Sequence, residues 1–134
     1  MPRLTKALAA TAVIAAAVGL LAGAAGATRT IKVPSKVSIA SNNLRFTGKV
    51  TSPTYTPCAQ ERKVILYKVV SGGPDQAVGE TRTNLKGKWS IVPQGSAGIS
   101  LAHFYAKVHR EPEGTAGTIY VCQAAKSRVV GANS

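Results

Sequence analysis

The stretch LRFTGKVT, Leu44 to Thr51, decides the fold class of this chain. Apolar or small residues alternate along it with basic residues and threonines. A period of two, with one polar side, is typical of a half-buried antiparallel β-strand. One side of the strand should therefore face a core and carry Leu44, Phe46, Gly48 and Val50.

The segments around this stretch also have the character of short strands. KVSIA (36–40) precedes it, and Ser41-Asn42-Asn43 is a suitable hairpin connection because Asn tolerates positive φ. RKVILYKVV (62–70) is apolar on both sides, as a central strand would be. Further strands are expected at 76–83, 88–92, 101–109, 117–123 and 127–131, and the prolines after residue 28 fall between these runs.

This pattern predicts an all-β fold: a single antiparallel β-sandwich of about seven or eight strands. The sandwich should span residues 36–131, after a lead-in at 28–35 and before a tail at 132–134. Phe104 and Trp89 are expected in its core.

The first 27 residues have the features of a secretory signal peptide, expected to be helical. Arg3 and Lys6 precede an uncharged run that ends at Ala25-Gly26-Ala27, a small-x-small cleavage site. Cleavage after Ala24 and retention as a membrane anchor are the alternatives. We expect bacterial export to the cell envelope or beyond, with no membrane span left after cleavage.

The mature chain would carry two cysteines and a strong positive charge. In an exported protein, Cys58 and Cys122 are expected to form a disulfide, because an even cysteine count in such proteins usually means pairing. Loss of Arg3 and Lys6 leaves 15 of the 17 basic residues against 5 acidic ones, a formal charge of +10.

The segment TNLKGKWSI, Thr83 to Ile91, resembles the hairpin Thr-(Asp/Asn)-x-x-Gly-x-aromatic-x-apolar of carboxypeptidase-regulatory-like and transthyretin-like (Ig-like) sandwiches. The resemblance extends over about residues 40–130 and includes FYAKV (104–108) and the region around Cys122. It implies that Gly87 adopts a turn conformation and that Trp89 fills the core. It implies a fold but no reaction, and no catalytic or binding residue follows from it.

The two histidines lie in LAHFYAKVH (101–109), the segment that most resembles a site. At period two, His103 and His109 share the outward side with Lys107 between them. Six residues of strand separate them by roughly 20 Å, too far for one metal ion. We predict no metal, no cofactor and no catalytic residue.

The positive charge remains as the functional signal. A field of this size attracts polyanions, here anionic cell-wall polymers, polysaccharides or lipid head groups. Nucleic acid is a poorer candidate because few aromatic residues are left for base stacking. The alternatives are a charge that only maintains solubility, a small exported enzyme or inhibitor, and a purely structural accessory domain. The residues expected in an anion-binding patch are Arg45, Lys49, Lys86 and Lys88.

Overall fold

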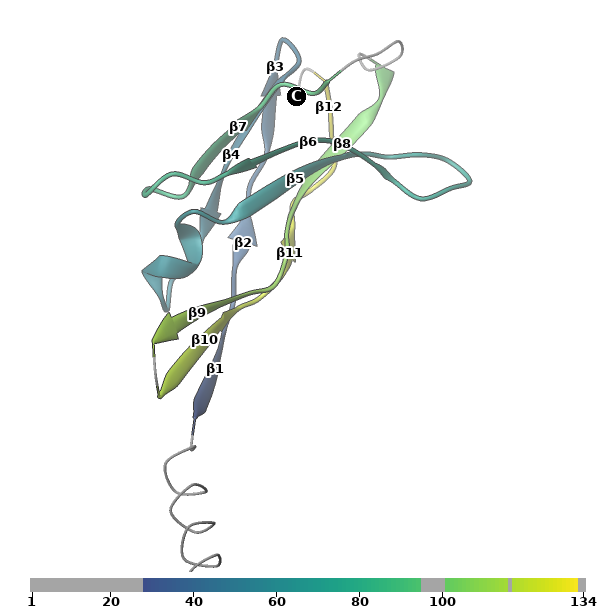
Figure 1. Cartoon of the computed structure of the whole chain (residues 1–134). Coiled ribbons are helices and arrows are strands. Elements are labelled where there is room, and N and C mark those ends of the chain that lie inside the picture. Colours follow the sequence, from purple (N-terminus) through teal and green to yellow (C-terminus); the bar gives the residue numbers. More distant parts are fainter. Residues whose placement is uncertain (1–27, 95–100, 116, 133–134) are drawn as a thin grey trace, which may run out of the picture.

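A computed structural model of the chain describes residues 28–94, 101–115 and 117–132 (Figure 1). The predicted signal peptide, 1–27, lies outside the described residues. The described part is all-β, with one 3₁₀ turn, η1, at Thr56–Ala59. Its strands are β1 (Arg29–Val33), β2 (Lys36–Val37), β3 (Ala40–Asn42), β4 (Arg45–Thr51), β5 (Lys63–Lys68), β6 (Gln76–Arg82), β7 (Lys88–Ile91), β8 (His103–Val108), β9 (Glu111–Thr115), β10 (Thr118–Cys122), β11 (Ala125–Lys126) and β12 (Val130–Gly131).

Two antiparallel sheets form a β-sandwich, which confirms the predicted fold class. In one sheet, β4 pairs with β2 and β3 along one edge and with β7 along the other. In the second sheet, β5 lies between β6 and β8, and β8 also pairs with β11 and β12. The central position of β5 agrees with the prediction, and Val64 and Leu66 on its inner side are buried, whereas Ile65 on its outer side is half-buried.

The sandwich core follows the alternation seen in the sequence. Phe46 and Val50 of β4 are fully buried, whereas the intervening Thr47 and Lys49 are exposed. In β8, Phe104, Ala106 and Val108 are buried, as predicted for the side opposite the histidines. The rings of Phe46 and Phe104 meet between the sheets with centroids 4.7 Å apart. Trp89 also lies in this core.

The β3–β4 hairpin differs from the prediction by about two residues. Its connection is Asn43-Leu44, both with positive φ, rather than Ser41 to Asn43. Two-residue loops with two positive φ angles match the twist of the flanking strands, so turn geometry overrides the apolar character of Leu44. The Leu44 side chain was expected to face the core but is 36% exposed.

A third sheet lies at one end of the molecule (Figure 1) and was not predicted. We call this sheet the extension. In it, β10 pairs with β1 in parallel and with β9 in the antiparallel sense. The segment 28–35, expected as a lead-in, thus contains a strand, and Pro112, expected between strands, belongs to β9. Pro112 is tolerated because β9 is an edge strand. At the other end of the chain, Ala132, expected in the tail, is buried in the core.

Candidate anion-binding site

The structure pairs Cys58 with Cys122, with an S–S distance of 1.97 Å. The bond joins η1 of the sandwich to β10 of the extension and is fully buried. A disulfide indicates a non-reducing compartment. Within the described ranges, no helix is long and apolar enough to cross a bilayer.

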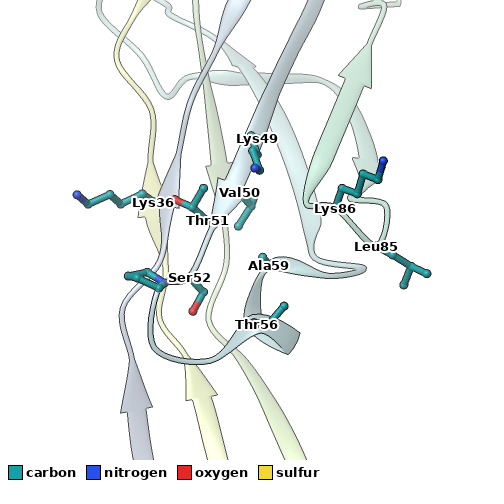
Figure 2. Close-up of a pocket in the computed structure, with 10 residues that line it drawn as sticks. Lys36, Lys49, Val50, Thr51, Ser52, Thr56, Ala59, Leu85 and Lys86 are labelled. Atoms are coloured by element: carbon teal, nitrogen blue, oxygen red, sulfur yellow. The ribbon is translucent and has the colours of Figure 1, made fainter.

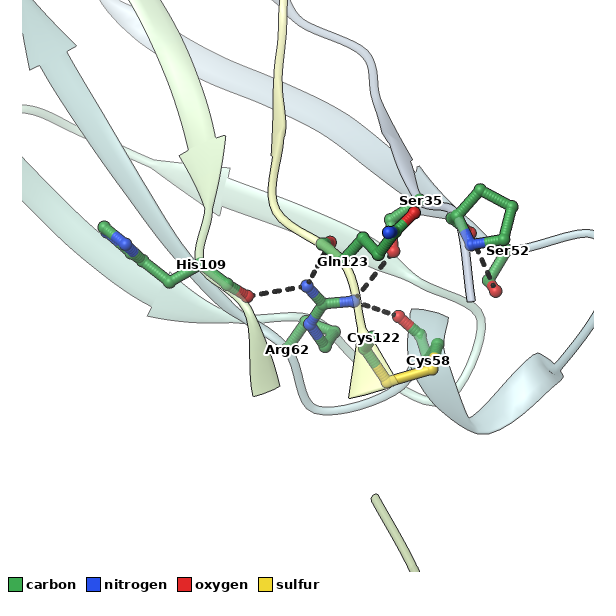
Figure 3. Close-up of a disulfide and its surroundings, with 8 residues drawn as sticks. Ser35, Ser52, Cys58, Arg62, His109, Cys122 and Gln123 are labelled. Carbon is green, nitrogen blue, oxygen red and sulfur yellow. Dashed lines mark hydrogen bonds between the residues drawn. A yellow bond between two sulfur atoms is a disulfide. The ribbon is translucent and has the colours of Figure 1, made fainter. Parts of the chain in front are cut away.

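Beside the disulfide lies Arg62, whose side chain is completely buried (Figure 3). Its guanidinium donates to the carbonyl oxygens of Cys58 at 2.7 Å, His109 at 2.8 Å and Gln123 at 3.1 Å, and to Ser35 Oγ at 3.1 Å. Burial lowers the pKa of Arg62, while the carboxylates of Glu111 and Glu113 act in the opposite direction. A guanidinium stays charged even so. Arg62 therefore connects the sandwich to the extension, a role that the sequence did not reveal.

The hairpin motif at Thr83–Ile91 stabilises the local fold through its hydrogen bonds and its turn. Thr83 is buried, and its hydroxyl donates to the Ala59 carbonyl and accepts from Arg62 N. Asn84 Oδ1 accepts from the backbone N–H groups of Lys86 and Lys88. Gly87 has φ +79°, as predicted, and a Cβ there would collide with the carbonyl oxygen of Val50.

This hairpin is fixed against β4, and a pocket of ≈ 460 Å³ opens where the two meet (Figure 2). The Val50 N–H donates to the Gly87 carbonyl at 2.8 Å, which sets the distance between the hairpin turn and β4. Three lysines from separate segments line the opening, which we call the lysine pocket: Lys36 of β2, Lys49 of β4 and Lys86 of the hairpin. Lys36 and Lys86 flank it on opposite sides, with Lys49 between them (Figure 2).

The rest of the lysine pocket is apolar or carries hydroxyl groups, and no carboxylate lines it: the other lining residues are Val50, Thr51, Ser52, Pro53, Thr56, Ala59 and Leu85. Leu85, at the tip of the hairpin, is 70% exposed. Among the described residues, none of the three lysines has an ion-pair partner. The pocket therefore offers three uncompensated positive charges beside an apolar surface.

The structure brings together only part of the predicted patch. Lys49 and Lys86 line the lysine pocket, whereas Arg45 and Lys88 do not. Arg45 donates to Ser90 Oγ at 3.2 Å, and Lys88 lies opposite Lys49 in the β4–β7 ladder. Lys36 was missed because it lies opposite Thr51 only when the turn is Asn43-Leu44, whereas the sequence predicted Ser41 to Asn43.

The strand pairing that places Lys36 beside β4 keeps its register across an interruption between β2 and β3. The Lys49 N–H donates to Ser38 Oγ at 2.9 Å, and the Ser38 N–H donates to the Lys49 carbonyl. The Ser38 carbonyl instead turns toward Gly48, where a Cβ would collide with it. Gly48 thus allows the close approach that keeps Lys36 beside the end of β4.

The two histidines take no part in the lysine pocket. His103 is exposed on β8, and the His109 backbone carbonyl accepts from Arg62. In the part of the chain that the structure describes, no group of three or more His, Cys, Asp or Glu residues could hold a metal ion.

No family model and no curated protein matches this chain. The geometry of the lysine pocket is therefore the basis for proposing a function.

Proposed function

We propose that this protein is an exported, non-catalytic β-sandwich module that binds an anionic polymer of the cell surface or its surroundings. The lysine pocket would be the binding site. The observation that carries the proposal is that Lys36, Lys49 and Lys86 all line one pocket whose lining contains no carboxylate.

The charge of the whole chain supports this proposal. A formal charge of +10 on the mature chain would draw a polyanion toward the surface from a distance. At the pocket, the lysine amines would contact the anionic groups, and the hydroxyls of Thr51, Ser52 and Thr56 could hydrogen-bond neutral parts of the polymer. Export is proposed on the basis of the leader and agrees with the disulfide.

The test is a binding titration of the mature chain, residues 28–134, with heparin at about 0.15 M salt. The triple variant Lys36→Gln, Lys49→Gln, Lys86→Gln should bind about tenfold more weakly or worse, since each exposed charge contributes up to about 1 kcal/mol. A matched control, Arg45→Gln, Lys68→Gln, Lys107→Gln, removes the same charge from residues outside the pocket.

The two variants distinguish binding at the lysine pocket from general electrostatic attraction. If the control weakens binding as much as the pocket variant does, the attraction is general charge and the proposal fails. Retention on isolated cell wall, compared for the same two variants, extends the test to a natural polymer.

A further inference from the structure

In the extension, the alternation of side chains along the strands places the carboxylates on one face. Paired residues in a ladder place their side chains on the same face, and successive residues alternate. Glu111 and Glu113 of β9 lie opposite Cys122 and Tyr120, so both carboxylates share the face of the disulfide. The Glu111 carboxylate accepts from the Lys63 N–H, and both glutamates act to raise the pKa of Arg62. The opposite face contains no carboxylate of these strands.

That opposite face holds a second pocket, of ≈ 490 Å³, lined by Lys32, Arg110, Val121, Gln123 and Ala124. Lys32 of β1 lies directly opposite Val121 of β10. Val121 is only 5% exposed although it lies on the side away from the disulfide. We call this the Lys32–Arg110 pocket: two cations and an amide beside an apolar surface, with no carboxylate in the lining.

The backbone beneath this pocket is held in place. The Gln123 N–H donates to the Val33 carbonyl at 2.8 Å, and the Gln123 carbonyl accepts from the buried Arg62. The preceding residue, Cys122, is fixed by the disulfide. A fixed backbone beneath the site reduces the conformational entropy that is lost on binding.

We propose that the Lys32–Arg110 pocket is a second anion-binding site, which takes a carboxylate or sulfate group of an anionic polysaccharide. Arg110 can bind a carboxylate or sulfate with two parallel hydrogen bonds, which Lys cannot do. The Gln123 amide can bond a sugar hydroxyl. This second site does not rest on the proposed function of the lysine pocket.

The experiment titrates the mature chain with a short heparin oligosaccharide, by calorimetry. The wild type should bind two oligosaccharides, and Lys32→Gln with Arg110→Gln should reduce this number to one. The lysine-pocket triple variant should also bind one.

A matched control removes two charges from outside both pockets: Arg29→Gln, on the other face of β1, with Lys107→Gln. This control should still bind two oligosaccharides. A wild type that binds one, unaffected by Lys32→Gln with Arg110→Gln, overturns the second site and leaves the proposed function intact. Conversely, if only the lysine-pocket variant is without effect, the proposed function fails and the second site stands. Equal losses in the control overturn both.

Discussion

In the sandwich, twelve of the described residues form one buried apolar core, whereas the buried cluster at the extension consists of Val33 and the two half-cystines. The extension adds partly buried Ile31 and a stacked pair, Tyr55 and Tyr120, with ring centroids 3.8 Å apart. The sandwich is therefore stabilised mainly by hydrophobic burial. The extension is attached by a covalent bond and by the hydrogen bonds of Arg62.

The difference shows what a small sheet needs when it cannot build a core. Three short strands bury too little apolar area to offset the entropy of ordering them. Cys58–Cys122 and Arg62 both fasten the extension to the sandwich at the same place. Stabilisation of this kind needs few residues, but it fails when one of them is changed.

The largest effect is expected in the sandwich core. Phe104→Ala should lower the free energy of unfolding by about 3–5 kcal/mol, because it removes a fully buried ring and leaves a cavity. Urea denaturation followed by Trp89 fluorescence measures the loss. Ile65→Ala, on the half-buried outer face of β5, should cost about 1 kcal/mol. Equal losses at the two positions would contradict a stabilising core between the sheets.

Removal of the disulfide should destabilise the extension. Cys58→Ala with Cys122→Ala opens a loop with a sequence separation of 64 and should cost up to about 4 kcal/mol. Hydrogen exchange should then show protection lost first in Thr118–Cys122, while β5 and β8 keep theirs. A uniform loss across both sheets would show that the extension and the sandwich unfold as one unit.

Arg62→Lys keeps the charge but cannot reach all four oxygens that the guanidinium bonds. We expect a loss of about 1–3 kcal/mol, because buried acceptors remain without donors. Arg82 is exposed and donates to the Glu61 carbonyl, so Arg82→Lys should change stability by less than about 0.5 kcal/mol. If Arg62→Lys is equally neutral, the carbonyl cluster does not hold the extension.

The smallest effect concerns the outer face of the sandwich, where the Tyr105 hydroxyl donates to Asp75 at 2.6 Å. This hydrogen bond lowers the pKa of Asp75 and raises that of Tyr105 to about 12. Since the folded-state pKa of Asp75 is lowered, the stabilisation is present above the unfolded pKa of about 4 and is lost as pH falls through the folded value. For Tyr105 it is present below about 10 and is lost as pH rises through about 12.

An NMR titration of Asp75 in the wild type and in Tyr105→Phe measures this link. The pKa of Asp75 should move up toward its ordinary value in the variant, because its main hydrogen-bond donor is gone. An unchanged titration would show that the bond does not persist in solution. Tyr105→Phe should leave the extension unaffected, in contrast to Arg62→Lys.

The sandwich strands could be predicted because they repeat a local signal. Strands such as β4 and β8 alternate buried apolar with more polar residues, and turn residues separate one strand from the next. Phe46, Val50 and Phe104 are therefore where the pattern placed them. In the extension, β10 was expected at 117–123, whereas β1 and β9 lack this signal, since RTIKV is short and Pro112 interrupts its segment. The pairing of β1 also depends on a distant partner, since Arg29 lies opposite Thr118 of β10.

The candidate site, too, could be predicted from the sequence only in part. Proximity in the sequence could suggest Lys49, on a strand face, and Lys86, at a hairpin tip, but not that they share a pocket. Their meeting depends on the bond between Val50 and Gly87, which joins β4 to a turn almost 40 residues later.

By itself, the sequence determined the fold class, the disulfide pairing and the excess of positive charge. These follow from periodicity, from the presence of only two cysteines and from composition, none of which requires knowing which strands meet. Only the tertiary structure decided that Lys36, Lys49 and Lys86 line one pocket and that Arg62 is buried among carbonyl oxygens. Such groupings depend on contacts between distant segments, which backbone pairing and core packing fix together.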